Sequence, residues 1–175
     1  MILRLTKSAS EKQEIKLSSD SIANIAKNRY CDWFVDIFNG GDRKKYFLIT
    51  NAFSLFSIVL PSKGLNSAES FLETVKRELQ EYFAYRNLNE IFLEFIAPNL
   101  GKIEFAKKNS RSVQGCMNGM KEHIPYGIKR YGDLAKQKNR FLLNDDLNRY
   151  PTNCANTGAG DYTFAEKLIT SDLMK

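Results

Sequence analysis

The chain has 175 residues, of which 43% are hydrophobic and 12% aromatic, and its net charge at pH 7 is +6. This length and apolar content suit one folded domain and exclude a wholly disordered chain. No apolar run approaches the roughly 20 residues that a membrane-spanning helix needs, so we expect no membrane partner.

The chain begins with a short apolar stretch, Met1–Leu5, which is too short for a signal peptide. Its three cysteines, Cys31, Cys116 and Cys154, are odd in number and widely spaced. This spacing matches neither a disulfide framework nor a zinc motif. We therefore expect a cytoplasmic protein whose cysteines are reduced.

Alternating apolar and polar residues predict four strands and a turn in the first third of the chain. The half-buried first strand is expected at Ile2–Thr6 and a second at Trp33–Phe38. The glycines of residues 39–42 predict a hairpin turn that returns the chain as Tyr46–Thr50. A further strand, Phe53–Leu60, completes an antiparallel meander.

The remaining elements are predicted to be mainly helical. Residues 66–83 have an apolar stripe at helical spacing, and Lys102–Lys107 alternates as a strand. A helix follows Asn109, and Pro125 is expected to kink or end it near Ile124, because proline lacks the N–H that the helix needs.

Three further segments follow Pro125. We expect a basic helix over Tyr126–Lys138 and loops over residues 139–161, where Asn144-Asp145-Asp146 has turn chemistry. A last helix is expected to begin at Asp161.

These elements predict the fold class and its boundaries. We expect one α+β domain with a mainly antiparallel sheet of four to five strands, packed by helices on one side. Residues 1–150 would form the core domain, and residues 151–175 a C-terminal loop and helix packed on it. The expected core residues are Leu5, Trp33, Val35, Phe47, Ile49, Leu55, Ile58, Phe71, Val75, Leu79, Phe105, Val113, Met117 and Met120.

The helix that follows Asn109 has two contrasting faces. At helical spacing its apolar face carries Val113, Met117 and Met120, and the opposite face has a glycine, Gly115, at its centre. The N-terminus of a helix attracts anions, and an arginine there can form a bidentate pair with phosphate or carboxylate. The predicted ligand-binding residues are Asn109, Arg111, Ser112, Asn118 and Glu122. The alternative is helix-to-sheet packing with Arg111 in a structural salt bridge.

Basic residues are concentrated in one part of the chain. Residues 101–150 carry 11 basic and 5 acidic side chains, a surplus equal to the whole net charge. Tyrosines and a phenylalanine alternate with them, as in surfaces that neutralise phosphates and stack bases. The alternative is a solvated helical face with buried aromatics. The predicted nucleic-acid-binding residues are Lys107, Lys108, Lys129, Arg130, Lys136, Lys138 and Arg140.

The sequence offers little catalytic chemistry. His123 is the single histidine, so a histidine-rich metal site and a mechanism with two imidazoles are excluded. Asp145 and Asp146 could hold Mg²⁺ with Asp161 or Glu122, but a turn or cap is the stronger interpretation. No phosphate-binding glycine motif occurs. We therefore predict no catalytic residue, no metal site and no cofactor.

Several short motifs resemble a bacterial family of small proteins of unassigned function, a domain of unknown function. That family has a short N-terminal strand, a strand that begins with tryptophan, a D-R-(K/R)-K hairpin and a segment N-R-S-V-x-G-x-M-N. Two positions differ from the family pattern. Ser110 stands where the family usually has asparagine. Gly119 stands where an acidic residue often follows the Met-Asn pair. The resemblance implies the order of the fold and no activity. The matching stretches are Met1–Lys7, Trp33, Asp42–Lys45, Thr50-Asn51, Ser54–Ser57, Arg111–Val113, Gly115, Met117-Asn118 and Leu147-Asn148.

Three functional hypotheses remain open. The first is a binding module for nucleic acid or another polyanion, acting through the basic region 101–150. The second is an enzyme of unrecognised type on a phosphorylated substrate, with Arg111 and Glu122 converging in a pocket. The third is a protein–protein interaction domain whose basic face meets an acidic protein. The sequence does not indicate an oligomeric state.

Overall fold

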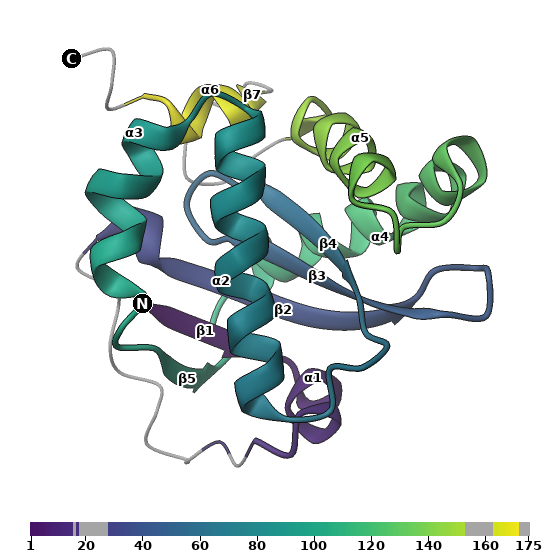
Figure 1. Cartoon of the computed structure of the whole chain (residues 1–175), viewed down its shortest axis with the longest axis horizontal. Coiled ribbons are helices and arrows are strands. Elements are labelled where there is room, and N and C mark those ends of the chain that lie inside the picture. Colours follow the sequence, from purple (N-terminus) through teal and green to yellow (C-terminus); the bar gives the residue numbers. More distant parts are fainter. Residues whose placement is uncertain (16, 18–27, 153–162, 172–175) are drawn as a thin grey trace.

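The fold is built on a five-stranded mixed sheet with the strand order β4-β3-β2-β1-β5 (Figure 1). The computed structural model describes residues 1–15, 17, 28–152 and 163–171. β1 is parallel to both of its neighbours, whereas β2, β3 and β4 form the antiparallel meander predicted above. The strands of the sheet are β1 (Ile2–Leu5), β2 (Asp32–Asn39), β3 (Lys45–Asn51), β4 (Ser57–Pro61) and β5 (Glu104–Lys107), and β6 (Pro151–Thr152) pairs separately with β7 (Thr163–Phe164).

Helices cover both faces of this sheet. In Figure 1, α2 crosses the near face with α3 beside it, whereas α4 runs behind the sheet. The α+β class and the mostly antiparallel sheet are confirmed, but the expectation of helices on one side only is wrong. The helical segments are α1 (Lys7–Lys12), η1 (Arg29–Cys31), α2 (Ala68–Tyr85), α3 (Asn89–Ile91), η2 (Phe92–Ile96), η3 (Ala97–Asn99), α4 (Arg111–Tyr131), α5 (Gln137–Asn148) and α6 (Ala165–Ile169).

Strand alternation explains the two helical layers. Side chains at alternate positions of a strand point to opposite faces, and here both sets are apolar. Trp33 and Val35 join the core under α2, while Phe34 joins the core under α4 and α5. All the predicted core residues are buried except Phe105, which is half-buried. The buried residues therefore form two cores, one on each side of the sheet.

β1 is more deeply buried than its alternating sequence predicts. All four of its residues are buried, because the strand lies between β2 and β5 rather than at an edge. Arg4, the polar residue in this alternation, donates from Nε and Nη2 to the two carboxylate oxygens of Asp32, at 2.7 and 2.9 Å. A buried charge needs such a partner.

The elements around Pro125 differ from the expectation in two ways. α4 does not end near Ile124 but continues through Pro125 to Tyr131, so residues 126–138 are not a separate helix. Residues 139–148, expected to be loop, belong to α5. A proline inside a helix costs about 3 kcal/mol, and burial of Ile124 and Ile128 on either side of it offsets this cost. The expected helix start at Asp161 lies outside the described residues.

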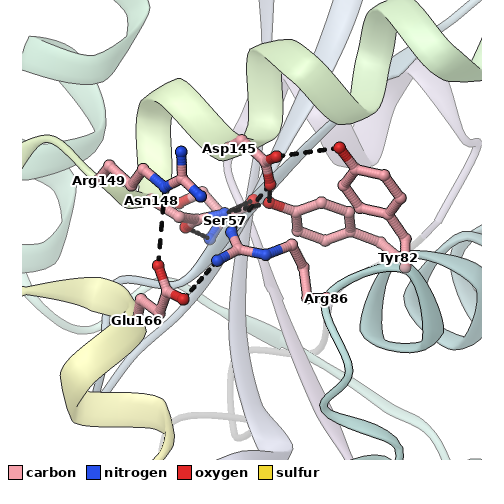
Figure 2. A network of polar contacts seen from close by, with 8 residues as sticks. Ser57, Tyr82, Arg86, Asp145, Asn148, Arg149 and Glu166 are labelled. Atoms are coloured by element: carbon pink, nitrogen blue, oxygen red, sulfur yellow. Dashed lines mark hydrogen bonds and ion pairs between the residues drawn. The ribbon is translucent and has the colours of Figure 1, made fainter.

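Two asparagines of α5 cover the free edge of the sheet. Asn148 accepts a hydrogen bond from the backbone N–H of Ser57 at 2.6 Å and donates to the carbonyl oxygen of the same residue at 2.8 Å. Asn144 accepts from the backbone N–H of Val59 at 2.9 Å. These bonds occupy backbone groups of β4 that an edge strand would otherwise leave without a strand partner, and Figure 2 shows the contact at Ser57.

We expect Asn148→Ala to lower the free energy of unfolding by about 2–4 kcal/mol, because it leaves two buried backbone groups of β4 without partners. Urea denaturation followed by circular dichroism measures the change. Asn139→Ala, on the half-buried part of α5, is the control and should have a much smaller effect. Equal losses in the two variants would contradict a special role for the edge contact.

Candidate functional site

The described structure has a topological switch point at the carboxyl ends of β1 and β5. The chain leaves β1 through α1, which packs with the α2 layer through Ala9, and leaves β5 through α4, which packs on the opposite face. Where neighbouring parallel strands send their connections to opposite faces, a crevice opens at their carboxyl ends. Ligands of α/β proteins bind in such crevices.

Two adjoining cavities form this crevice, and Lys108 lines both. One, of about 460 Å³, lies between α1 and the end of β5. The other, of about 430 Å³, lies at the start of α4. Their described lining residues are Leu5, Lys7, Ser10, Glu11, Leu17, Lys107 and Lys108 in the first, and Lys108, Asn109, Ser110, Arg111, Gln114, Gly115 and Asn118 in the second.

The crevice is strongly positive. Lys7, Lys107, Lys108 and Arg111 are all exposed, and Glu11 is the one carboxylate among the described lining residues. Lys7 lies 3.8 Å from Glu11, with both side chains mostly in solvent, so this pair is weak and leaves the lysine accessible. The positive end of the α4 dipole points into the same space.

A buried carboxylate anchors α4 beside the crevice. Lys121 Nζ donates to Asp36 Oδ2 at 2.6 Å and Gln114 Nε2 donates to the same oxygen at 3.3 Å, while Thr6 donates to Oδ1 at 2.9 Å. Burial raises the pKa of the Asp36 carboxyl, but the hydrogen bonds from Lys121, Thr6 and Gln114 outweigh burial and bring the pKa below its ordinary value. This carboxylate is therefore ionised and structural.

We expect stability at low pH to depend on Asp36 and Lys121. Because folding lowers the pKa of Asp36, its contribution is complete above the ordinary value of 3.8 and is lost as the pH falls through the lower folded value. Lys121→Met removes the strongest opposing hydrogen bond, so the stability that ionised Asp36 contributes above pH 4 should be lost, and stability should fall less steeply between pH 4 and pH 2.5 than in the wild type. Urea denaturation from pH 2.5 to 7 tests this, with Lys129→Met as the exposed control. If the free energy of unfolding of Lys121→Met fell with acid as steeply as that of the wild type, the prediction would be contradicted.

The glycines on the exposed face of α4 have no packing role. A Cβ added to Gly115 or to Gly119 would meet nothing within 4 Å. Each glycine costs about 1 kcal/mol of helix stability relative to alanine. Neighbouring groups of the described fold do not account for this cost, and Gly115 leaves open space in the cavity lining beside Gln114 and Asn118.

The structure brings together some of the predicted ligand-binding residues. Asn109, Arg111 and Asn118 line the same cavity, and Asn118 accepts a hydrogen bond from Gln114 at 3.2 Å. Ser112 is exposed but outside the described lining. Glu122 lies about 16 Å along the helix axis from Arg111, so the two do not converge.

The predicted nucleic-acid-binding residues separate into two groups. Lys107 and Lys108 lie at the crevice, whereas Lys129 and Arg130 lie near the end of α4, about 27 Å from its start. The exposed Lys136 and Lys138 follow this second group in the chain. The predicted basic surface is therefore divided between the crevice at the start of α4 and the far end of this helix.

Arg140, the last of the predicted nucleic-acid-binding residues, makes contacts that stabilise the fold. Its Nε and Nη2 donate to the two carboxylate oxygens of Glu78 at 2.7 and 2.8 Å, and its Nη1 donates to the carbonyl oxygens of Leu134 and Ala135. The Arg140 side chain is 12% exposed and that of Glu78 is 2% exposed. These contacts join α5 to α2 and leave little of Arg140 for a ligand.

We expect Arg140→Met to destabilise the fold by about 3–5 kcal/mol, because it leaves the buried Glu78 charge without its partner. Lys138→Met, an exposed residue of the same helix, should leave the stability unchanged. Thermal and urea denaturation of both variants measure this contrast. A stable Arg140→Met variant would show that Arg140 is not structural.

The acidic pair that could have held Mg²⁺ is engaged in other contacts. Asp145 accepts hydrogen bonds from Tyr82 at 2.9 Å and from Arg86 at 2.8 Å, and Arg86 also pairs with Glu166 (Figure 2). Asp146 accepts from Tyr131 and lies 3.5 Å from Arg130. In the described ranges no group of three or more His, Cys, Asp or Glu side chains is placed to hold a metal ion.

The network in Figure 2 joins α2, α5 and α6. Burial, with the charge of Asp145 beside it, raises the pKa of Tyr82, which therefore remains a neutral hydrogen-bond donor. Asn148 donates to the Tyr82 hydroxyl at 3.1 Å, which links this network to the edge of the sheet. The donors and acceptors satisfy one another, and the arrangement stabilises the packing of α5.

Sequence reasoning missed two parts of the crevice. Lys7 lies about a hundred residues from Lys107 in the chain, and the parallel pairing of β1 with β5 brings them to one cavity. Gln114 lies on the half-buried side of α4, between the predicted apolar and polar faces. Gln114 could have been predicted from its spacing, because residues four apart on a helix are neighbours, and Gln114 precedes Asn118 by four.

The fold and the crevice define a single α+β domain with a basic cleft at a switch point. The chain belongs to the family described as Domain of unknown function (DUF6933), whose model matches residues 2–168. The expectation that the chain belongs to a family of unassigned function is thereby confirmed. No curated protein and no solved structure was found to match the chain. Within the described residues, no helix is long and apolar enough to cross a membrane.

Proposed function

We propose that this chain is a polyanion-binding module whose primary anion site is the crevice at the ends of β1 and β5. The observation that carries the proposal is the convergence of Lys7, Lys107, Lys108 and Arg111 on two adjoining cavities with one carboxylate, Glu11, in their described lining. Exposed cations at a helix N-terminus bind phosphate through charge and through backbone N–H groups.

The geometry favours binding over catalysis. A phosphate-processing enzyme needs a base or metal beside its anion site. Glu122 lies about 16 Å from Arg111 along α4, and His123 about 18 Å. Asp36, the carboxylate that Gln114 of α4 contacts, is already bonded to Lys121, Gln114 and Thr6, and Glu11 of the crevice lies 3.8 Å from Lys7.

The extent of the positive surface favours a long anion. The patch at Lys129 and Arg130 lies about 27 Å along α4 from the crevice. In B-DNA this length corresponds to about eight base pairs at 3.4 Å for each phosphate of one strand. A nucleic acid can therefore contact both patches at once, whereas a small phosphorylated molecule contacts one.

The test is binding of fluorescein-labelled 12-nucleotide single strands and 12-base-pair duplexes, followed by fluorescence polarisation between 50 and 300 mM salt. We expect saturable binding that weakens as salt rises. The double variant Lys108→Ala/Arg111→Ala should bind more weakly. On the single strand its slope of log K against log salt should be shallower by about 1.4, or 0.7 for each lost phosphate contact.

The matched control is Lys76→Ala/Arg77→Ala on α2, which removes the same charge from the other face of the sheet. Its binding should change little. No binding by the wild-type protein at 50 mM salt would overturn the proposal. Equal weakening by both double variants would show an effect of overall charge without a site at the crevice.

A further inference from the structure

A second, aromatic cavity lies between α4 and α5. Its volume is about 310 Å³, and it is separate from the crevice. On α4 it begins about 18 Å along the axis from Arg111. Its described lining residues are His123, Tyr126, Gly127, Arg130, Leu143, Asp146, Leu147 and Tyr150.

The walls of this cavity are exposed aromatic rings. Tyr126 is 74% exposed and Tyr150 is 46% exposed, which is unusual for large side chains beside an apolar surface. The His123 ring packs against Tyr150 with their centroids 4.4 Å apart. Three rings therefore border one opening, and their faces offer stacking surfaces.

The floor of the cavity is apolar and depends on a glycine. Leu143 and Leu147 of α5 are buried there. A Cβ on Gly127 would lie 2.3 Å from Leu143 Cδ1, so any larger residue there would force the buried Leu143 side chain or the helices to move. The helix contact is thus explained by packing, and the open space above it is not.

The polar residues at the opening of the cavity provide a hydrogen-bond donor, a hydrogen-bond acceptor and a positive charge. Arg130 and Asp146 lie 3.5 Å apart, and their side chains are 72% and 47% exposed. An arginine beside aromatic rings can contact a phosphate or stack on a base. Asp146 makes its contacts to Arg130 and Tyr131 through Oδ2, and the second oxygen of a carboxylate can accept a hydrogen bond from the amino group of a base edge.

We propose that this cavity is a slot for one unpaired base of a single-stranded nucleic acid. Aromatic walls, an apolar floor and a rim with donor and acceptor groups suit a planar heterocycle that carries a phosphate. The slot and the crevice lie along the same helix, so one strand can place phosphates at Arg111 and a base at Tyr126. This inference rests on the proposed function, because it assumes that the polyanion is a nucleic acid.

The slot predicts a preference for unpaired bases. In a duplex the bases are stacked and paired, and extraction of one costs free energy. The single strand should therefore bind more tightly than the duplex of equal length. Stacking on aromatic side chains accepts every base, so we expect little sequence preference.

The test compares a 12-nucleotide oligothymidylate with an abasic strand of the same length and phosphate number. The wild-type protein should bind the thymidylate about ten-fold more tightly, within the range measured for stacking of one base. Tyr126→Ala should reduce this ratio toward one, and Tyr126→Phe should keep it because the ring remains. Equal binding of the two strands by the wild type, or loss of the ratio in Tyr126→Phe, would overturn the slot.

The crevice variant separates this inference from the proposed function. Lys108→Ala/Arg111→Ala should weaken both strands equally and leave the ratio unchanged, because it removes phosphate contacts alone. Failure of the abasic strand to bind wild type at low salt would contradict the anion site. A missing base preference with normal abasic binding would contradict the slot alone.

His123 gives a direct readout, since it is the single histidine of the chain. Its imidazole proton resonances should shift on addition of oligothymidylate and stay in place with the abasic strand, in both cases at saturation. Shifts with adenosine monophosphate, without a preference between the two strands, would show a free-nucleotide site and overturn the strand proposal. Tyr126 is exposed, so its variants should keep the wild-type melting temperature, which serves as the folding control.

Discussion

The position of β1 at the centre of the sheet is the constraint from which the other features follow. This strand of four residues is buried on both faces and pairs in parallel with β2 and β5. Its arginine, Arg4, is tolerated there because Asp32 accepts both of its hydrogen bonds. A shift of the strand by one residue would move Arg4 to the opposite face, away from Asp32. The ion pair therefore favours one register, and that register sets which ends of β1 and β5 meet at the crevice.

The same constraint orients α4. The face of β2 beneath this helix carries Asp32, Phe34 and Asp36 by strand alternation. Phe34 and the neighbouring strands hold the apolar stripe of α4, while Asp36 holds Lys121 and Gln114. An apolar stripe alone permits some rotation of a helix, whereas a buried carboxylate with two side-chain donors on that helix does not. The glycine-bearing face is thus fixed toward solvent, with Arg111 at the crevice and Tyr126 at the second cavity.

Local patterns predicted the elements that local forces determine. Alternation identified β2 and β3, and helical periodicity identified the buried face of α4, including Val113 and Met117. The predictions at Pro125 and at Asn144-Asp145-Asp146 were wrong for the same reason. Proline commonly ends a helix and Asn-Asp runs commonly form turns, but contacts with distant parts of the chain override both local preferences here. Asn144 bonds to β4 and Asp145 to Arg86, so residues that commonly form turns are held in a helix. The crevice could be predicted only in part, since the pairing of β1 with β5 depends on contacts across a hundred residues.

The basic side chains of this chain fall into two groups, those that are buried in ion pairs and those that are exposed to solvent. Arg4, Arg86 and Arg140 have nearly buried side chains, and each is paired with a carboxylate, so they contribute to the fold. The exposed cations lie in solvent, where each contributes to the external field of the protein. Those at the two ends of α4 lie farther apart than the screening length of about 8 Å at physiological salt. Under the proposed function each patch would attract phosphates independently, and a ligand that reaches both would gain the second contact as an intramolecular step.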